Sequence, residues 1–451
     1  MENDSNKLKY KKAIINIIYS FTWDVTECDF NELVESSKYI KNWKKLFLFE
    51  RPVELMDSKK QAAYHPNIIS QNLSVLHRDE TINEDVEIIV PNNAKGLIQS
   101  KIITKLSYSL RIYENGSGNC TFSFDIIEPS YYKINAILRL SSSIVIESKL
   151  QEKNYPTSSI IKMNSSLGKY FKENYSEIEL IKIFDAILND SIFPEIWKSK
   201  NLWFDKKTIN NKNDCFNNWQ TPYALSIIEL DENDYRDFED LQKKDTIKEL
   251  GAIACRLSSE NDKIETEYLK LKREYIFDSL GFYRCQFDKE KKDGIRLKNY
   301  SHHADLFYTI GKRGALAITY DLNCNPSYYA IPTLLNLVEI LRSRWHLGSI
   351  VNLKLDDTLQ LIARSRNLEI VLDDIFLCRA LFGFFLQNPA PYLFDGGAIT
   401  EIAEAGEETF WLKRLTLETE RKFDVLDKLL KDQLERKRLN SLMEYYNQKS
   451  I

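Results

Sequence analysis

Three residues in the N-terminal half have the types and spacing of a hydrolytic metal centre. Glu147 and Lys149 end the apolar segment Ile144-Val-Ile146, and Asp125 lies on a preceding predicted strand. Residues two apart on a strand point to the same face, so Glu147 and Lys149 can act together. An Asp and a Glu that hold a divalent metal ion, beside a Lys that orients or activates water, suit phosphodiester hydrolysis. The alternative is a strand end with two solvated charges, because short motifs recur by chance.

Two other clusters contain residues that bind metals or move protons. His302, His303 and Asp305 are potential metal ligands, but adjacent strand residues point to opposite faces, so the histidines do not readily share one ion. We interpret this cluster as the polar entry to a hairpin. Arg342 and His346 lie one helical turn apart and resemble the Arg and His of HEPN-type ribonucleases, although that family usually separates the pair by more residues. The alternative is a packed helix face that pairs with carboxylates such as Asp356 or Asp357.

Common enzyme motifs are absent from the sequence. No Gly-x-x-x-x-Gly-Lys phosphate loop, Gly-x-Gly-x-x-Gly dinucleotide fingerprint or Gly-x-Ser-x-Gly elbow occurs. The basic run Arg436-Lys-Arg438 is able to touch phosphate, but Glu435 precedes it and Glu444 follows. We therefore interpret it as a solvated helix face.

Composition limits the class of protein. The 451 residues suffice for two or three domains, and 62 Lys and Arg against 66 Asp and Glu give a net charge of -4, which does not favour general binding to nucleic acid. Cysteines are scattered without a Cys-x-x-Cys pair, and the N-terminus is polar and acidic, so we expect a soluble, cytoplasmic protein. The most apolar stretch, Ile375 to Leu386, is about half of a membrane span of roughly 20 residues.

Hydrophobic periodicity predicts an α+β fold. Residues 105–113 and 120–127 alternate apolar and polar residues around a turn with Gly116 and Gly118, which predicts a β-hairpin. Further strands are expected at 86–90, 144–146 and 223–230, and a second hairpin at 305–320. The Asn-rich stretch 206–218 has the composition of a linker. We therefore predict four parts, which are an N-terminal α+β domain (1–205), this linker, a second α/β domain (219–330) and a helical stalk (331–451).

The stalk is predicted to contain three helices, at about 332–363, 366–387 and 400–447. Apolar residues recur every three or four positions along the last of them and define a stripe, called here the C-terminal stripe, on a helix otherwise covered by charges. Such a stripe must be buried, against the preceding helices or against a partner chain in a coiled coil. Its residues are Leu412, Leu415, Phe423, Leu426, Leu430 and Leu434.

The order of these patterns resembles the cytosolic part of CorA-type divalent-cation channels. Thr333 to Leu341 is similar to the segment that leads from that family's sheet domain into its stalk, and Leu426 to Tyr446 resembles the end of the stalk helix. The resemblance covers residues 220–448 and implies a CorA-like fold with oligomerising helices. The family's Gly-Met-Asn motif and membrane spans are missing, so it does not imply ion conduction.

Two functions of different class follow. The first is a non-enzymatic protein that forms homo-oligomers or binds a protein partner through its stalk, without a cofactor. The alternative is a nuclease-like effector with a PD-(D/E)xK-like centre at Asp125, Glu147 and Lys149, which requires a divalent metal ion. We favour the first.

Overall fold

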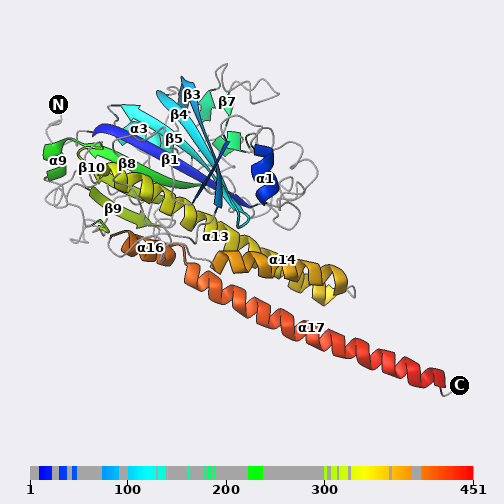
Figure 1. Ribbon diagram of the computed structural model, residues 1–451. Helices are drawn as coiled ribbons and strands as arrows, with labels where there is room; N and C mark the ends of the chain where they lie inside the picture. Colours follow the sequence, from blue (N-terminus) through cyan, green and yellow to red (C-terminus); the bar gives the residue numbers. More distant parts are fainter. Residues whose placement is uncertain are drawn as a thin grey trace, which may run out of the picture. The chain divides into compact units, whose positions relative to one another are not determined.

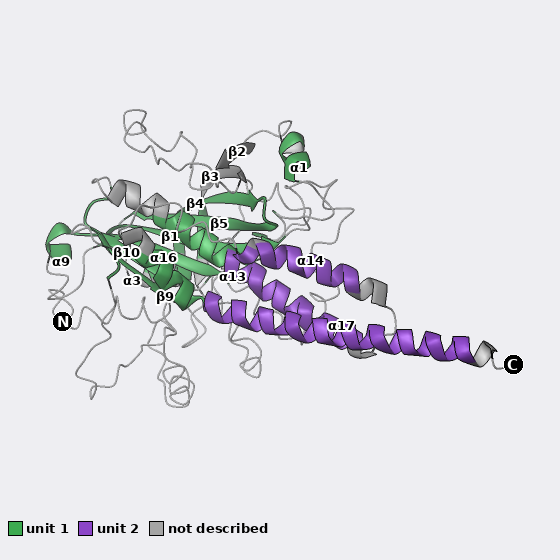
Figure 2. Cartoon of the chain, turned by 60° about the horizontal axis from the view of Figure 1, so that its bottom comes forward, with its two compact units in different colours: residues 1–343, 389–410 green, residues 344–388, 411–451 purple. Residues whose placement is uncertain are grey.

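The computed structural model describes the sheet strands, the helices that cover them and most of the C-terminal helices. The described residues are 10–22, 30–37, 43–47, 74–90, 100–127, 129, 131–138, 140, 160–162, 177–178, 180–181, 183–184, 187, 222–236, 299–301, 306–311, 314–322, 327–364, 368–386 and 398–449. The chain is α+β, as predicted, and divides into two compact units. Unit 1 comprises residues 1–343 and 389–410, and unit 2 comprises residues 344–388 and 411–451 (Figure 2). No helix among these residues is long and apolar enough to cross a bilayer.

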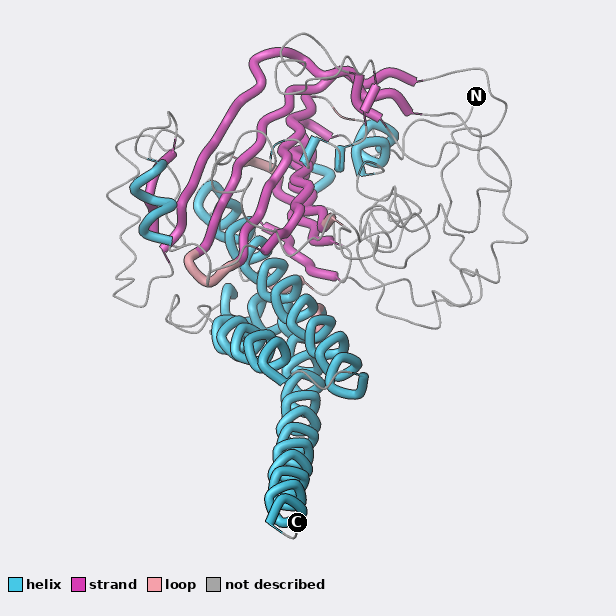
Figure 3. The backbone as a smooth tube through the Cα atoms, turned by 90° about the vertical axis from the view of Figure 1, so that its right-hand side faces the viewer, coloured by secondary structure: helices cyan, strands magenta, loops and turns pink. Residues whose placement is uncertain are grey.

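The strands described in unit 1, ten in number, form one mixed, twisted sheet (Figures 1 and 3). Its order is β7-β6-β3-β4-β5-β1-β8-β10-β9, with β2 paired to β3 outside this path. All neighbours are antiparallel except β8 and β10, which are parallel. The strands are β1 (Tyr10–Thr22), β2 (Trp43–Phe47), β3 (Ser74–Val90), β4 (Ser100–Tyr113), β5 (Ser117–Ile127), β6 (Ile160–Lys162), β7 (Glu177–Ile178), β8 (Tyr223–Leu230), β9 (Leu306–Gly311) and β10 (Gly314–Thr319).

The single sheet corrects the predicted division into two sheet domains. β8 lies in the proposed second domain, yet it pairs along its length with β1, with Ile14 opposite Ile227. β1 therefore joins the strands of both predicted domains, and 1–205 and 219–330 are not separate sheets. The predicted linker at 206–218 and the predicted strand at 144–146 lie outside the described residues.

Both predicted hairpins are present. β4 pairs with β5, and β9 pairs with β10, in antiparallel register. In the first turn Gly116 has a φ of 85°, the left-handed conformation for which glycine was expected. Gly118 has another role, because a Cβ there would lie 2.3 Å from the Phe21 ring and 2.7 Å from the Arg111 carbonyl oxygen.

The two faces of the sheet differ in character. One face carries the main apolar cluster, to which β1 contributes Ala13, Ile15 and Ile17, and which includes residues of α1 (Phe30–Ser37) and α3 (Tyr131–Leu138). The other face is polar along β1, β4 and β5, where Ser107 stands opposite Ser123. The first part of α13 (Ser327–Arg364) packs on this polar face through Glu339, and α16 (Ala398–Thr409) packs near β9. A short helix, α9 (Glu232–Arg236), follows β8.

Unit 2 contains the second part of α13 with α14 (Leu368–Leu386) and α17 (Leu412–Lys449). The first two helices agree with the prediction. The third does not, because the expected helix at 400–447 is divided into α16 and α17 at Trp411, whose φ is 54°. A left-handed residue cannot continue a right-handed helix, and the break coincides with the boundary between the units.

The two glycines of the first hairpin give a test of these roles. Gly116→Ala places a Cβ on a left-handed residue, which costs about 1 kcal/mol of unfolding free energy. Gly118→Ala must displace a ring and a backbone carbonyl and should cost more, roughly 2–3 kcal/mol, as for an overpacked core. Urea unfolding of both variants measures the difference. Equal losses would contradict the packing role of Gly118.

Candidate functional site

The structure describes only one member of the predicted metal centre. Asp125 lies on β5, where its Oδ2 is 3.0 Å from the Lys12 ammonium, and its side chain is 41% exposed. Glu147 and Lys149 lie outside the described residues, so their position relative to Asp125 is not tested. Among the residues that the structure describes, no three His, Cys, Asp or Glu side chains form a group able to hold a metal ion. His302, His303 and Asp305 also lie outside this set.

The second predicted site is buried within the chain. Arg342, in unit 1, is 5% exposed, and His346, in unit 2, is fully buried. Burial lowers the pKa of Arg342 to about 10, with Tyr223 acting in the opposite direction. In unit 2, Arg344 donates from Nε to the Phe385 carbonyl at 3.3 Å. These side chains pack in the core, where they are not open to a nucleic-acid substrate, and Asp356 accepts a bond from Lys422 instead of an arginine.

The most strongly buried charges of the described residues lie in unit 1, between the polar face of the sheet and α13. Arg111 on β4 and Glu339 on α13 are 2% and 0% exposed and lie 3.4 Å apart between Nη1 and Oε2. Thr121 donates to Glu339 Oε1 at 2.7 Å, and Asn119 donates from Nδ2 to the Glu339 carbonyl at 2.9 Å. A buried carboxylate requires such partners because desolvation is costly.

Neighbouring groups extend this network. Asn119 also donates to the Tyr113 hydroxyl at 3.2 Å, and Ser20 donates to Asn119 Oδ1 at 2.7 Å. Burial, followed by the charge of Glu339, raises the pKa of Tyr113 to about 12 and also raises the pKa of the Cys120 thiol. A thiol held in its neutral form is a poor nucleophile, so the network is suited to positioning α13 on the sheet and not to covalent chemistry.

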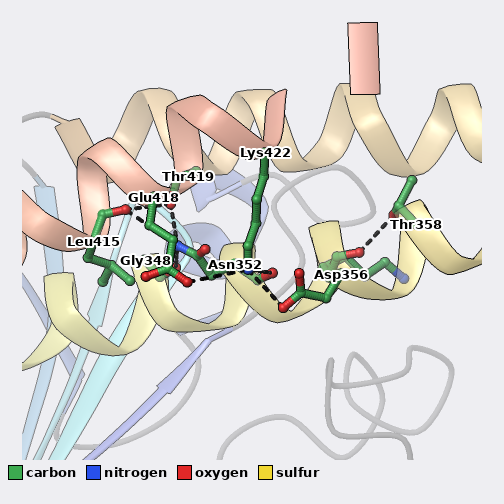
Figure 4. A network of polar contacts seen from close by, with 9 residues as sticks. Gly348, Asn352, Asp356, Thr358, Leu415, Glu418, Thr419 and Lys422 are labelled. Carbon is green, nitrogen blue, oxygen red and sulfur yellow. Dashed lines mark hydrogen bonds and ion pairs between the residues drawn. The ribbon is translucent and has the colours of Figure 1, made fainter. Parts of the chain in front are cut away.

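In unit 2, a polar network joins α13 to α17 (Figure 4). Asn352, which is buried, donates from Nδ2 to the Thr419 hydroxyl and lies 3.5 Å from the Leu415 carbonyl. Lys422 bonds to Asp356 Oδ2 at 2.8 Å and to the Asn352 carbonyl at 3.1 Å. These directional contacts fix the register of the two helices.

Packing within unit 2 buries most of the C-terminal stripe. Phe423 packs on Phe382 of α14, with ring centroids 5.5 Å apart, and Leu426 is 0% exposed. Leu412 is also buried, Leu415 and Leu430 are half-buried, and Leu434 is 58% exposed. Most of the predicted interface is therefore interior to its own chain.

Beyond Gln433, which donates to the Ile362 carbonyl at 3.0 Å, α17 continues past the ends of α13 and α14 (Figures 1 and 3). We call residues 434–449 the distal segment. Every side chain described in it, from 434 to 446, is exposed. Its large exposed apolar residues are Leu434, Leu439, Leu442, Met443, Tyr445 and Tyr446. The surface of the distal segment is the strongest functional candidate. The sequence pattern indicates the helix α17 but not the residue at which its burial ends.

Comparisons of the chain with protein-family models, curated proteins and solved structures find no significant match.

The buried ion pair predicts an asymmetric response to mutation. Arg111→Met leaves the Glu339 carboxylate buried without its cation and should cost about 3–5 kcal/mol of unfolding free energy. Arg111→Met combined with Glu339→Gln removes both charges and should cost less than that single change. Arg236→Met breaks an exposed pair with Glu232 and should change stability by less than about 0.5 kcal/mol. Denaturant unfolding measures all three, and a double variant no more stable than Arg111→Met would contradict the pairing.

The raised pKa of Tyr113 predicts a loss of stability in alkali. The folded state keeps the phenol proton up to about pH 12, whereas an unfolded tyrosine releases it near its ordinary value of 10.0. Stability from this group is therefore present below pH 10 and is lost as the pH rises toward 12. Tyr113→Phe should make the decline over this window shallower in urea unfolding. An unchanged slope would show that Tyr113 ionises as easily in the folded state as in the unfolded chain.

Proposed function

We propose that this protein is a non-enzymatic scaffold that self-associates through the distal segment of α17, in the cytoplasm. The proposal rests on the exposed apolar surface of the distal segment, which lies beyond the last contact of α17 with α13 at Gln433. The partner we commit to is a second copy of the chain.

Helix physics supports this proposal. The distal segment is about 24 Å long at 1.5 Å per residue. An isolated helix of that length is marginal in water, because most helical stability in proteins comes from packing of an apolar face. Contiguous exposed apolar patches are uncommon on monomers and mark interaction sites. Association would bury the surface that the bundle leaves uncovered.

The arrangement of side chains within the segment also favours a helical partner. Leu439, Met443 and Tyr446 follow one another at intervals of four and three residues, with Leu442 beside them. At about 100° per residue they lie within one face of the helix, which we call the distal face. Its exposed fractions, 59% for Leu439 and 66% for Tyr446, leave that face available for docking.

The remaining features are compatible with this role. The resemblance of residues 220–448 to CorA-type cytosolic domains supports an oligomerising stalk. The scattered cysteines, of which Cys120 and Cys378 are buried free thiols, support a reducing compartment. No observation supports the nuclease-like alternative. Asp125 is ion-paired with Lys12, and the other two members of the predicted centre lie outside the described residues.

Charge on the distal face should disrupt the assembly. In the full chain, Leu439→Glu with Tyr446→Glu should shift the species seen by sedimentation or light scattering from oligomer to monomer. The dissociation constant should rise at least tenfold. The physical reason is that a carboxylate pays a large desolvation cost in an apolar interface.

Ser441→Glu supplies the matched control. Ser441 is exposed in the same segment, about 160° around the helix from Leu439, so its charge should leave the oligomer intact. Circular dichroism shows whether both variants stay folded. A wild-type chain that is monomeric at every concentration would overturn the proposed function.

A further inference from the structure

A second apolar face in unit 2 is uncovered, on α14. Leu372, Phe376, Ala380 and Gly383 lie along one side of this helix and are all exposed, and we call them the outer face of α14. Phe376 is 71% exposed, and a Cβ added at Gly383 would have nothing within 4 Å. The face thus offers two large side chains, Leu372 and Phe376, and two small positions, of which Gly383 has open space around it.

The outer face of α14 and the distal part of α17 share a spacing. Outer-face residues are separated by four, four and three positions, and Glu435, Leu439, Met443 and Tyr446 are separated in the same way. Helix faces that repeat with one period can remain in contact over several turns. The two stretches also match in length, since α14 has 19 residues and spans about 28 Å.

Their charges are complementary. The distal segment contains four basic and two acidic residues, a formal charge of +2, whereas α14 contains three acidic residues and one basic residue, a formal charge of -2. The one basic residue, Arg379, is already bound by both carboxylate oxygens of Asp427 in its own chain, at 2.6 and 2.8 Å. Asp373, beside the outer face, is exposed.

We propose that the distal segment of one copy docks on the outer face of α14 of a second copy, and reciprocally. This rests on the proposed self-association and names the surface that receives the segment. Aligned in parallel, Leu439 falls at Phe376, Met443 at Ala380 and Tyr446 at Gly383. Each large residue after the first pair meets a smaller one, and the open space at Gly383 admits the Tyr446 ring.

The direction of the helices agrees with a two-fold dimer. Within one chain α14 runs antiparallel to α17, since Phe382 contacts Phe423 and Arg379 contacts Asp427. A two-fold axis perpendicular to the helices reverses the second α17, which makes it parallel to the first α14. The contact at Arg379 and Asp427 places Asp373 near the level of Gln433, where α17 leaves its own bundle. Each distal segment therefore meets the other copy's α14 as soon as it emerges.

Changes of charge in the full chain test this docking. Asp373→Arg alone and Arg436→Asp alone should each weaken self-association at least tenfold, measured by sedimentation equilibrium at low ionic strength. The physical reason is that each change lowers the attraction between the acidic α14 and the basic distal segment. Asp357→Arg makes the same change of charge on an exposed residue of α13 and should have little effect.

A second substitution avoids charge. Gly383→Leu enters open space within its own chain, so the monomer should fold, but the new side chain occupies the place of the Tyr446 ring and should weaken association at least tenfold. Docking on α14 would be overturned if Gly383→Leu and Asp373→Arg left association unchanged while the Leu439→Glu with Tyr446→Glu variant lost it. The proposed function would then still stand. A wild-type chain that never associates would overturn both.

Discussion

The position of α13 on the sheet of unit 1 depends on the burial of one carboxylate. Glu339 projects from α13 into a sheet face where its carboxylate lies 3.4 Å from Arg111 and accepts a hydrogen bond from Thr121, while its backbone carbonyl accepts from the Asn119 amide. The cost of removing a carboxylate from water is several kcal/mol, and it is offset only where cation and donors are in place. A different register of α13 on the sheet would leave Arg111 and Glu339 buried apart from each other. The ion pair is thus better understood as a device that selects one docking position than as a source of net stability. Within unit 2, Asn352 and Asp356 of α13 bond to Thr419 and Lys422 of α17.

Local patterns were sufficient for the strands and helices that obey a simple period. Alternation identified β4 and β5, turn residues identified both hairpins, and the apolar helical period identified α13 and α14. Alternation alone also puts Arg111 on the polar face, and a polar face is ordinarily expected to meet water. That α13 covers it depends on a contact across more than two hundred residues, between Thr121 and Glu339. The sequence signal for this contact is Glu339, the single acidic residue within the apolar run Thr333 to Leu341. A charged residue in such a run is unusual unless it is paired.

Long-range pairing explains the two errors in architecture. β8 joins β1 because their apolar faces match, but nothing local in either strand specifies the other, so the composition of 206–218 predicts a domain boundary. The division of the last helix at Trp411 had no glycine or proline to mark it. A tryptophan in the left-handed region is sterically unfavourable, and tertiary contacts must hold it there. Phe410, the preceding residue, packs on Tyr223 with ring centroids 5.0 Å apart, which is one such contact within unit 1.

The C-terminal stripe shows why a periodic pattern does not by itself define an interface. Leu426 and Leu434 belong to the same repeat in sequence, yet one is in the core and the other is exposed, because Leu434 lies just beyond the contact of Gln433 with Ile362 near the end of α13. Beyond Gln433 the apolar positions also move around the helix, from the side that faces the bundle to the distal face of Leu439, Met443 and Tyr446. A helix that merely lengthened the bundle would have kept its apolar residues on the bundle side. The change of side at the point where intrachain packing ends is what favours a partner that approaches from another direction, as a second copy related by a two-fold axis would.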